Sequence, residues 1–216
     1  MRKYMITGLT LALAMVTPPA FAQAGGWSKN PADVPSGTYV LDPAHGKITW
    51  SLSHLGFSTY VGQFTDVNAT LKLDARNPAA STLEATVRTD SVGTLNAALD
   101  HHLKSADFFD VANHPVATFR ATQIRLIDSD TAEISGDLTL RGVTRPIVMT
   151  ADFNQGGVNP IDKKYTIGFD GHAKIKRSEY GINYGLPVVG DDVTLHFEAE
   201  FKAQSEAVAP AAKGKK

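Results

Sequence analysis

Apolar and polar residues alternate with a period of two along most of the chain. Such alternation is typical of strands that bury one face and expose the other. Short stretches rich in Gly, Pro, Asn and Asp separate the alternating segments and favour turns. With the less regular runs at 38–41, 64–73 and 116–126, the pattern predicts an all-β chain of roughly eight or nine strands. The clearest apolar rows are Ile48-Trp50-Leu52, Leu83-Ala85-Val87, Ile134-Leu138-Leu140, Ile147-Met149-Ala151-Phe153, Tyr165-Ile167-Phe169 and Val193-Leu195-Phe197-Ala199-Phe201.

The order of these segments favours a closed sheet. Strands that are neighbours in sequence pair as antiparallel hairpins, and a long sheet with one apolar face must pack on something or close on itself. Only the stretch from Leu95 to Asp110 has apolar residues at helical spacing. It is too short to cover a sheet, so we predict an antiparallel β-barrel with a short helical cap. A two-sheet sandwich would bury the same alternation and remains the alternative.

The amino-terminal residues predict export. Arg2 and Lys3 precede a mostly apolar run at 6–16, and Pro18-Pro19 and the small-x-small pattern Ala20-Phe21-Ala22 follow it. This is the pattern of a cleaved secretory signal, and the apolar run is shorter than the ~20 residues of a spanning helix. We therefore expect a periplasmic protein. The predicted organisation is a signal peptide at 1–22, a flexible lead-in at 23–36, a barrel domain at 37–203 and a disordered tail at 204–216.

Composition narrows the set of partners. The formal net charge is −1 and becomes more negative once Arg2 and Lys3 are removed, so the basic excess of a nucleic-acid binder is missing. No second long apolar run follows the signal, and we expect no stable membrane insertion. The chain has no cysteine. It must therefore depend on a hydrophobic core rather than on disulfides.

Candidate catalytic and metal-binding residues are few. None of the seven histidines stands in a metal-binding spacing, and the adjacent His101 and His102 would diverge by about 100° on a helix. There is no G-x-S-x-G elbow and no phosphate-binding glycine loop. The best acid–base set that the sequence offers is His102 with Asp107 or Asp110. We predict no catalytic site, no metal site and no cofactor.

Several segments together resemble the YceI-like family over roughly 37–202. The family's members are lipocalin-like barrels associated with polyisoprenoid lipids, so the resemblance implies an eight-stranded barrel of that kind and an isoprenoid ligand. Two departures, Leu99 where the family often has Arg and His114 where it often has Tyr, leave the headgroup preference open. The segments are Leu41-Asp42-Pro43-Ala44-His45, His54-Leu55-Gly56-Phe57-Ser58, Gly62-Gln63-Phe64, 102–110, 114–119, Gly136-Asp137-Leu138-Thr139-Leu140, Gly142-Val143-Thr144 and Arg177 with Tyr180-Gly181-Ile182.

Three functions follow as hypotheses. The first is a lipid-binding protein that holds an isoprenoid quinone or polyprenyl phosphate type of chain, for transport, storage or sequestration. A buried methylene contributes about 0.8 kcal/mol, so ten shielded carbons offer roughly 8 kcal/mol before ordering costs. The second is an enzyme acting on a small hydrophobic substrate. The third is a structural or stress-related interaction protein whose barrel is filled by its own side chains. A homodimer is left open.

The first hypothesis assigns ligand-binding residues. Apolar rows and aromatic rings predict the tunnel wall, with ordinary core packing as the alternative. Phe108 and Phe109 are expected to gate or line one end. Arg177 is the candidate for gripping a phosphate or quinone oxygen, with an ion pair to Glu179 or another surface carboxylate as the alternative. The predicted wall residues are Trp50, Leu52, Phe64, Leu138, Met149, Phe153 and Phe169.

Overall fold

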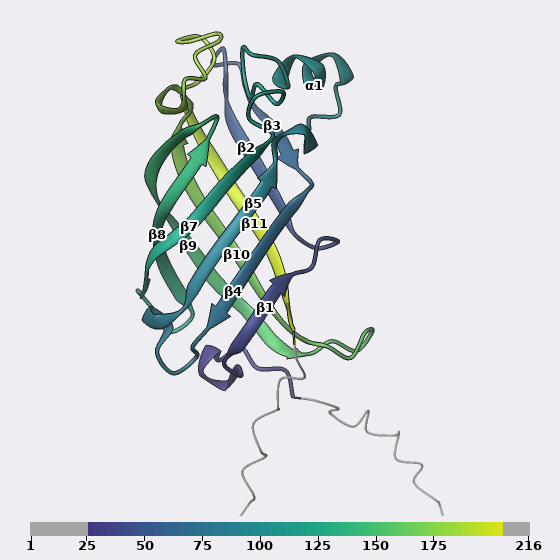
Figure 1. Cartoon of the computed structure of the whole chain (residues 1–216), viewed down its shortest axis with the longest axis vertical. Coiled ribbons are helices and arrows are strands. Elements are labelled where there is room, and N and C mark those ends of the chain that lie inside the picture. Colours follow the sequence, from purple (N-terminus) through teal and green to yellow (C-terminus); the bar gives the residue numbers. More distant parts are fainter. Residues whose placement is uncertain (1–25, 205–216) are drawn as a thin grey trace, which may run out of the picture.

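The computed structural model describes residues 26–204, which form one antiparallel sheet with short helices at its ends (Figure 1). The predicted signal peptide lies outside the described residues, as does the predicted tail except for Gln204. The strands are β1 (Gly37–Leu41), β2 (Lys47–His54), β3 (Ser58–Phe64), β4 (Val67–Leu73), β5 (Thr82–Arg88), β6 (Val92–Gly93), β7 (Val116–Leu126), β8 (Thr131–Leu140), β9 (Val143–Val158), β10 (Tyr165–Lys176) and β11 (Asp192–Ala203). The helices are α1 (Ala97–Leu103) and the 3₁₀ turns η1 (Pro31–Asp33), η2 (Pro78–Ala80), η3 (Thr89–Ser91) and η4 (Arg177–Tyr180).

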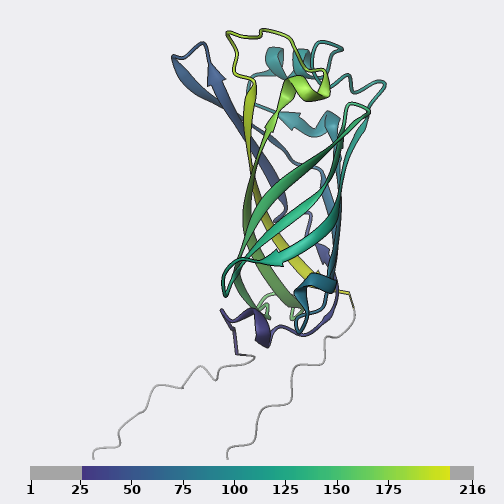
Figure 2. The same ribbon diagram turned by 90° about the vertical axis from the view of Figure 1, so that its left-hand side faces the viewer.

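The sheet closes into a barrel. Its strands follow the order β1-β4-β5-β7-β8-β9-β10-β11, and β11 pairs back to β1. The strands β2, β3 and β6 prolong β1, β4 and β5, respectively, beyond brief interruptions. β2 pairs with the first part of β11, and β3 pairs with both β2 and β6. The prediction of an eight-stranded antiparallel barrel with a helical cap is confirmed, and the sandwich alternative is wrong (Figures 1 and 2).

The two ends of the barrel differ. At one end, here called the helical end, lie α1, the β2–β3 turn and the loop 181–191. At the other, here called the terminal end, lie η1, η2 and both ends of the described chain. The predicted helical stretch forms only the seven residues of α1, which Asn96 caps by accepting a hydrogen bond from the Leu99 amide. The residues after Leu103 run as turns to the start of β7.

The interior divides into apolar clusters along the barrel axis. Buried residues of β1, β4, β9, β10 and β11 fill the terminal half, and a second group on β7 to β10 continues the core at mid-height. At the helical end, Leu103 of α1 joins Trp50, Phe64, Val92 and Val193. The alternation therefore places the apolar rows inward, as the sequence predicts.

The described part of the lead-in, from residue 26 onward, packs on the barrel. Ser28 and Gly156 exchange two backbone hydrogen bonds of 2.8 Å each, and Asn30 caps η1 through the Ala32 amide. Val34 is only 5% exposed and belongs to the core of the terminal half. The flexibility that the Gly, Pro, Asn and Ser content predicts for this segment stays a prediction. The composition of the segment indicates low helix and strand propensity. It does not indicate which residues of the barrel the segment contacts.

No helix in the described part of the chain has the length and apolar character needed to cross a bilayer.

One glycine is required by close packing. Gly62 on β3 faces Trp50 on β2, and a Cβ at residue 62 would lie 2.1 Å from a carbon of the buried indole ring. We expect Gly62→Ala to lower the free energy of unfolding by about 1–3 kcal/mol, because the indole must leave its rotamer. Urea unfolding midpoints measure this.

The matched control is Gly93→Ala on β6, where a Cβ would have no neighbour within 4 Å. Its free energy of unfolding should stay within about 0.5 kcal/mol of wild type. Equal losses in the two variants would show that backbone effects, and not the contact with Trp50, decide the result.

Candidate functional site

An apolar cavity of about 240 Å³ runs inside the barrel from mid-height to the terminal end. Strands all around the barrel contribute inward side chains to it. The cavity exists because several inward-facing positions carry alanine. The methyl group of an alanine fills less space than the larger side chains on the neighbouring strands. The main apolar lining is Leu41, Ile48, Val67, Ala69, Leu71, Leu83, Ala85, Val87, Phe119, Ile124, Leu138, Ile147, Met149, Ala151, Phe153, Phe169, Leu195, Phe197, Ala199 and Phe201.

Four of the predicted wall residues line this cavity. They are Leu138 on β8, Met149 and Phe153 on β9, and Phe169 on β10. Phe153 and Phe169 meet edge to face with ring centroids 5.5 Å apart, and Phe169 is 6.1 Å from the ring of Phe201. These rings form one side of the lumen in the terminal half. Their contact with a ligand stays a prediction.

Trp50, Leu52 and Phe64 lie elsewhere. They point inward but pack at the helical end, where Leu103 and the segment after α1 fill the barrel. The structure does not place them among the cavity-lining residues. Alternation shows which face of a strand points inward, but it does not show at what height the interior is filled.

Phe108 and Phe109 lie between the cavity and the helical end. The ring of Phe109 meets Phe64 at 5.2 Å, and the ring of Phe108 meets Tyr184 at 5.2 Å. Both pack on the cluster of Ala117, Leu140, Tyr180 and Ile182, against which the cavity residues Val87 and Leu138 also pack. The stretch thus lies beyond one end of the cavity, and neither ring is among the lining residues. Its action as a gate remains a prediction.

Arg177 is buried, with only 4% of its surface exposed. Its guanidinium donates to the backbone carbonyls of Gly190, Ile182, Tyr184 and Val189 at 2.8–3.0 Å. Burial lowers the pKa of this guanidinium from its usual value.

The buried position of Arg177 does not fit a surface ion pair, whereas its role in holding a headgroup stays a prediction. The side chain makes no surface pair with Glu179, and it lies at the helical end outside the cavity lining. Four of its five N–H groups are engaged in holding the loop 181–191. The local sequence around Arg177 does not indicate that the backbone carbonyls of the loop 181–191 surround its guanidinium. A headgroup contact at Arg177 stays untested.

The candidate acid–base pair forms, but away from the cavity. His102 Nε2 lies 2.9 Å from Asp107 Oδ2, and both side chains are partly exposed at the helical end. Asp110 instead accepts hydrogen bonds from Asn113 and lies 4.0 Å from His114. Neither His102 nor Asp107 belongs to the cavity lining.

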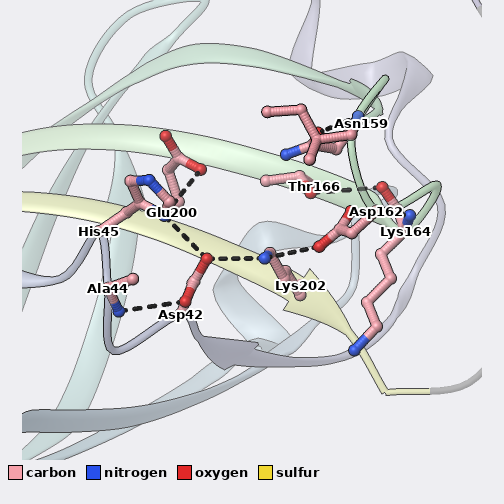
Figure 3. Close-up of polar contacts among 10 residues, drawn as sticks. Asp42, Ala44, His45, Asn159, Asp162, Lys164, Thr166, Glu200 and Lys202 are labelled. Carbon is pink, nitrogen blue, oxygen red and sulfur yellow. Dashed lines mark hydrogen bonds and ion pairs between the residues drawn. The ribbon is translucent and has the colours of Figure 1, made fainter.

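A polar cluster on the outer surface joins three segments near the terminal end (Figure 3). Asp42 Oδ2 lies 2.8 Å from His45 Nδ1 and 2.7 Å from Lys202 Nζ, and the same ammonium lies 2.6 Å from Asp162. Asp42, His45 and Glu200 are close enough to share an ion, within 4.8 Å of one another. However, the Lys202 ammonium already holds the Asp42 carboxylate. Within the described residues, the cluster serves to tie the β1–β2 corner to β11 and to the β9–β10 loop.

The pKa of Asp42 is held well below its usual value, chiefly by the hydrogen bond from Lys202 and then by that from His45. A carboxyl whose folded pKa is lowered stabilises the fold above its unfolded pKa of about 3.9, and this contribution is lost as pH falls below that value. We expect Asp42→Asn to lower the free energy of unfolding by about 1–2 kcal/mol at pH 7. The difference from wild type should shrink as pH approaches 3.

Urea unfolding at several pH values measures this difference. Glu179→Gln is the control, because Glu179 is exposed and makes no hydrogen bond in the described structure. A deficit in Asp42→Asn that stays constant down to pH 3 would contradict a contribution from the ionised carboxylate.

Comparison with known proteins identifies the domain. The YceI-like domain profile matches residues 39–201. A "UPF0312 protein" of Azotobacter vinelandii is 38% identical over 164 residues, which are 75% of this chain and 85% of the relative. The crystal structure of a Campylobacter jejuni YCEI protein is 31% identical, with a TM-score of 0.61, and the match covers 71% of this chain and 90% of that one.

A third match shares the fold at lower identity. A polyisoprenoid binding domain from Saccharophagus degradans is 18% identical, with a TM-score of 0.58, over 76% of this chain and 98% of that one. The family profile spans most of the barrel, and the first relative matches over most of its own length. This chain belongs to the YceI-like family.

Proposed function

We propose that this protein holds one isoprenoid-type lipid chain in its barrel cavity, without a covalent step, for transport, storage or sequestration in the periplasm. The observation that carries the proposal is the apolar lining of the cavity, to which strands all around the barrel contribute. The polyisoprenoid binding named for the Saccharophagus domain supports the same ligand class. The periplasmic location rests on the predicted signal at 1–22.

The size of the cavity limits what it encloses. At about 30 Å³ for a water-sized group, 240 Å³ holds a chain of roughly eight carbon atoms. Burying these carbons would contribute roughly 6 kcal/mol before ordering costs. A longer prenyl chain must therefore extend through one end of the barrel or displace side chains that fill it.

The two other hypotheses have less support. A barrel filled by its own side chains would leave no apolar volume of this size along half its length. The candidate acid–base pair His102 and Asp107 lies outside the cavity lining. Holding the ligand therefore accounts for the site better than catalysis does.

Recovering the natural ligand tests the proposal directly. The protein would be purified from the periplasm of its own cell and extracted with organic solvent for mass spectrometry. A prenyl lipid in a fixed ratio to protein is expected. Extraction of a mixture that matches the bulk membrane lipids would contradict a specific isoprenoid site.

A pair of substitutions on β9 tests the place of binding. Met149 lines the cavity, whereas its neighbour Val148 is exposed on the outer face. We expect Met149→Trp to weaken binding of farnesol at least tenfold, because the indole occupies the lumen, and Val148→Trp to bind as wild type does. Native mass spectrometry measures both affinities, and thermal melting confirms that both variants fold. Equal affinities in the two variants would place the ligand elsewhere.

A further inference from the structure

The helical end of the cavity is closed by packing and by polar ties. Phe108 and Phe109 lie against the buried clusters at that end. Arg141 donates to the carbonyls of Gly181 and Ala106, and Arg177 holds the loop 181–191. A ligand that used this end would have to displace aromatic side chains and break the hydrogen bonds that Arg141 and Arg177 donate, of which the bond from Arg177 to the Ile182 carbonyl is buried.

The terminal end is closed more lightly. The lining there comes from Pro31 and Val34, from the β4–β5 loop around Pro78, and from the β7–β8 turn. Leu126 belongs to that lining and is also 48% exposed, so the cavity reaches the surface at this end. The turn itself is anchored, because the Asp130 carbonyl accepts a hydrogen bond from the Phe153 amide.

The segment 27–35, here called the strap, crosses this end. Its backbone bonds to the barrel at two places: Ser28 pairs with Gly156, and the Pro35 carbonyl accepts a hydrogen bond of 2.6 Å from the Tyr39 hydroxyl of β1. The Trp27 Nε1–H also donates to the Val158 carbonyl at 3.1 Å. The Trp27 ring lies on Gly157, where a Cβ would be 2.4 Å from the ring. Trp27 is more than half exposed and Val34 is only 5% exposed, so release of the strap would wet the Val34 side chain and the covered part of the Trp27 ring.

The strap lies outside the match to the family profile. The family profile begins at residue 39, after the strap has ended. If cleavage follows Ala22, as the sequence predicts, the strap lies a few residues from a free chain end. Movement of residues 27–34 would then leave the strand pairings of the barrel intact, since the only ladder contact of this segment is the isolated bridge at Ser28.

We propose that the lipid chain enters and leaves through the terminal end and that the strap is the lid of that opening. This inference rests on the proposed lipid-binding function. Pro31 and Val34 cover the lumen when the strap is closed, and Trp27 on Gly157 is the latch that holds it. Opening also gives a prenyl chain longer than the cavity a path out of the barrel.

The test measures release of a farnesol-type fluorescent probe from loaded full-length protein to phosphatidylcholine vesicles by stopped flow. Trp27→Ala removes the latch, and Gly157→Ala displaces it with a single methyl group outside the cavity lining. Both variants should release the probe at least fivefold faster than wild type. The equilibrium Kd should change less than twofold, because a looser lid speeds binding and release alike. Trp27→Phe keeps a ring on Gly157, so its release rate should lie between the rates of wild type and Trp27→Ala.

Arg141→Ala is the matched control, since it loosens the helical end and should leave the release rate unchanged. Faster release in Arg141→Ala with wild-type rates in both latch variants would overturn the proposal and place the opening at the helical end. Wild-type rates in all variants would also overturn it, because the strap would then be a fixed part of the wall. Failure of wild-type protein to bind any prenyl probe would instead overturn the proposed function, and is seen before any rate is measured.

Discussion

The whole structure depends on the pairing of one strand with two others. β11 pairs with β2 through its first half and with β1 at its end, and this second pairing closes the sheet. The chain between β1 and β2 turns a corner at 42–46 while β11 runs on beside both. The ion pairs of Lys202 with Asp42 and Asp162 lie at this corner, where the backbone ladder is interrupted. Closure gives the inward rows a common interior, and without it there would be no lumen.

Side-chain size decides what the closed barrel contains. An eight-stranded barrel is just wide enough to be filled by its own side chains or to hold one small ligand. In the terminal half, the small residues Ala69, Ala85, Ala151 and Ala199 leave space between the larger ones. Near the helical end, Trp50, Phe64 and Leu103 fill the same cross-section. One pattern of alternation therefore produces a cavity in one part and a solid core in the other.

The contrast between the two ends links stability to function. The helical end is tied by Arg177, which satisfies four backbone carbonyls of a loop that has no sheet partner along most of its length. Leaving these carbonyls unpaired in a buried place would be costly, so this end resists opening. At the terminal end the cavity is covered by the strap and two short turns, and the ion pairs of Lys202 with Asp42 and Asp162 lie nearby on the outer surface. A binding protein needs one stable end to keep its shape and one labile end to exchange its ligand.

The sequence by itself determined the strands, their hairpin order, the closed barrel and a short helix near residue 100, because alternation and turn residues are local signals. It also identified Leu138, Met149, Phe153 and Phe169 as inward residues that prove to line the cavity. The tertiary structure alone decided the rest. Trp50 and Phe64 pack where Leu103 of α1 meets them. The carbonyls around Arg177 come from the loop 181–191. The strap contacts Gly156 and Gly157 of the distant strand β9. Each of these contacts joins residues whose neighbourhood exists only once the barrel has closed, which is why no local pattern could reveal them.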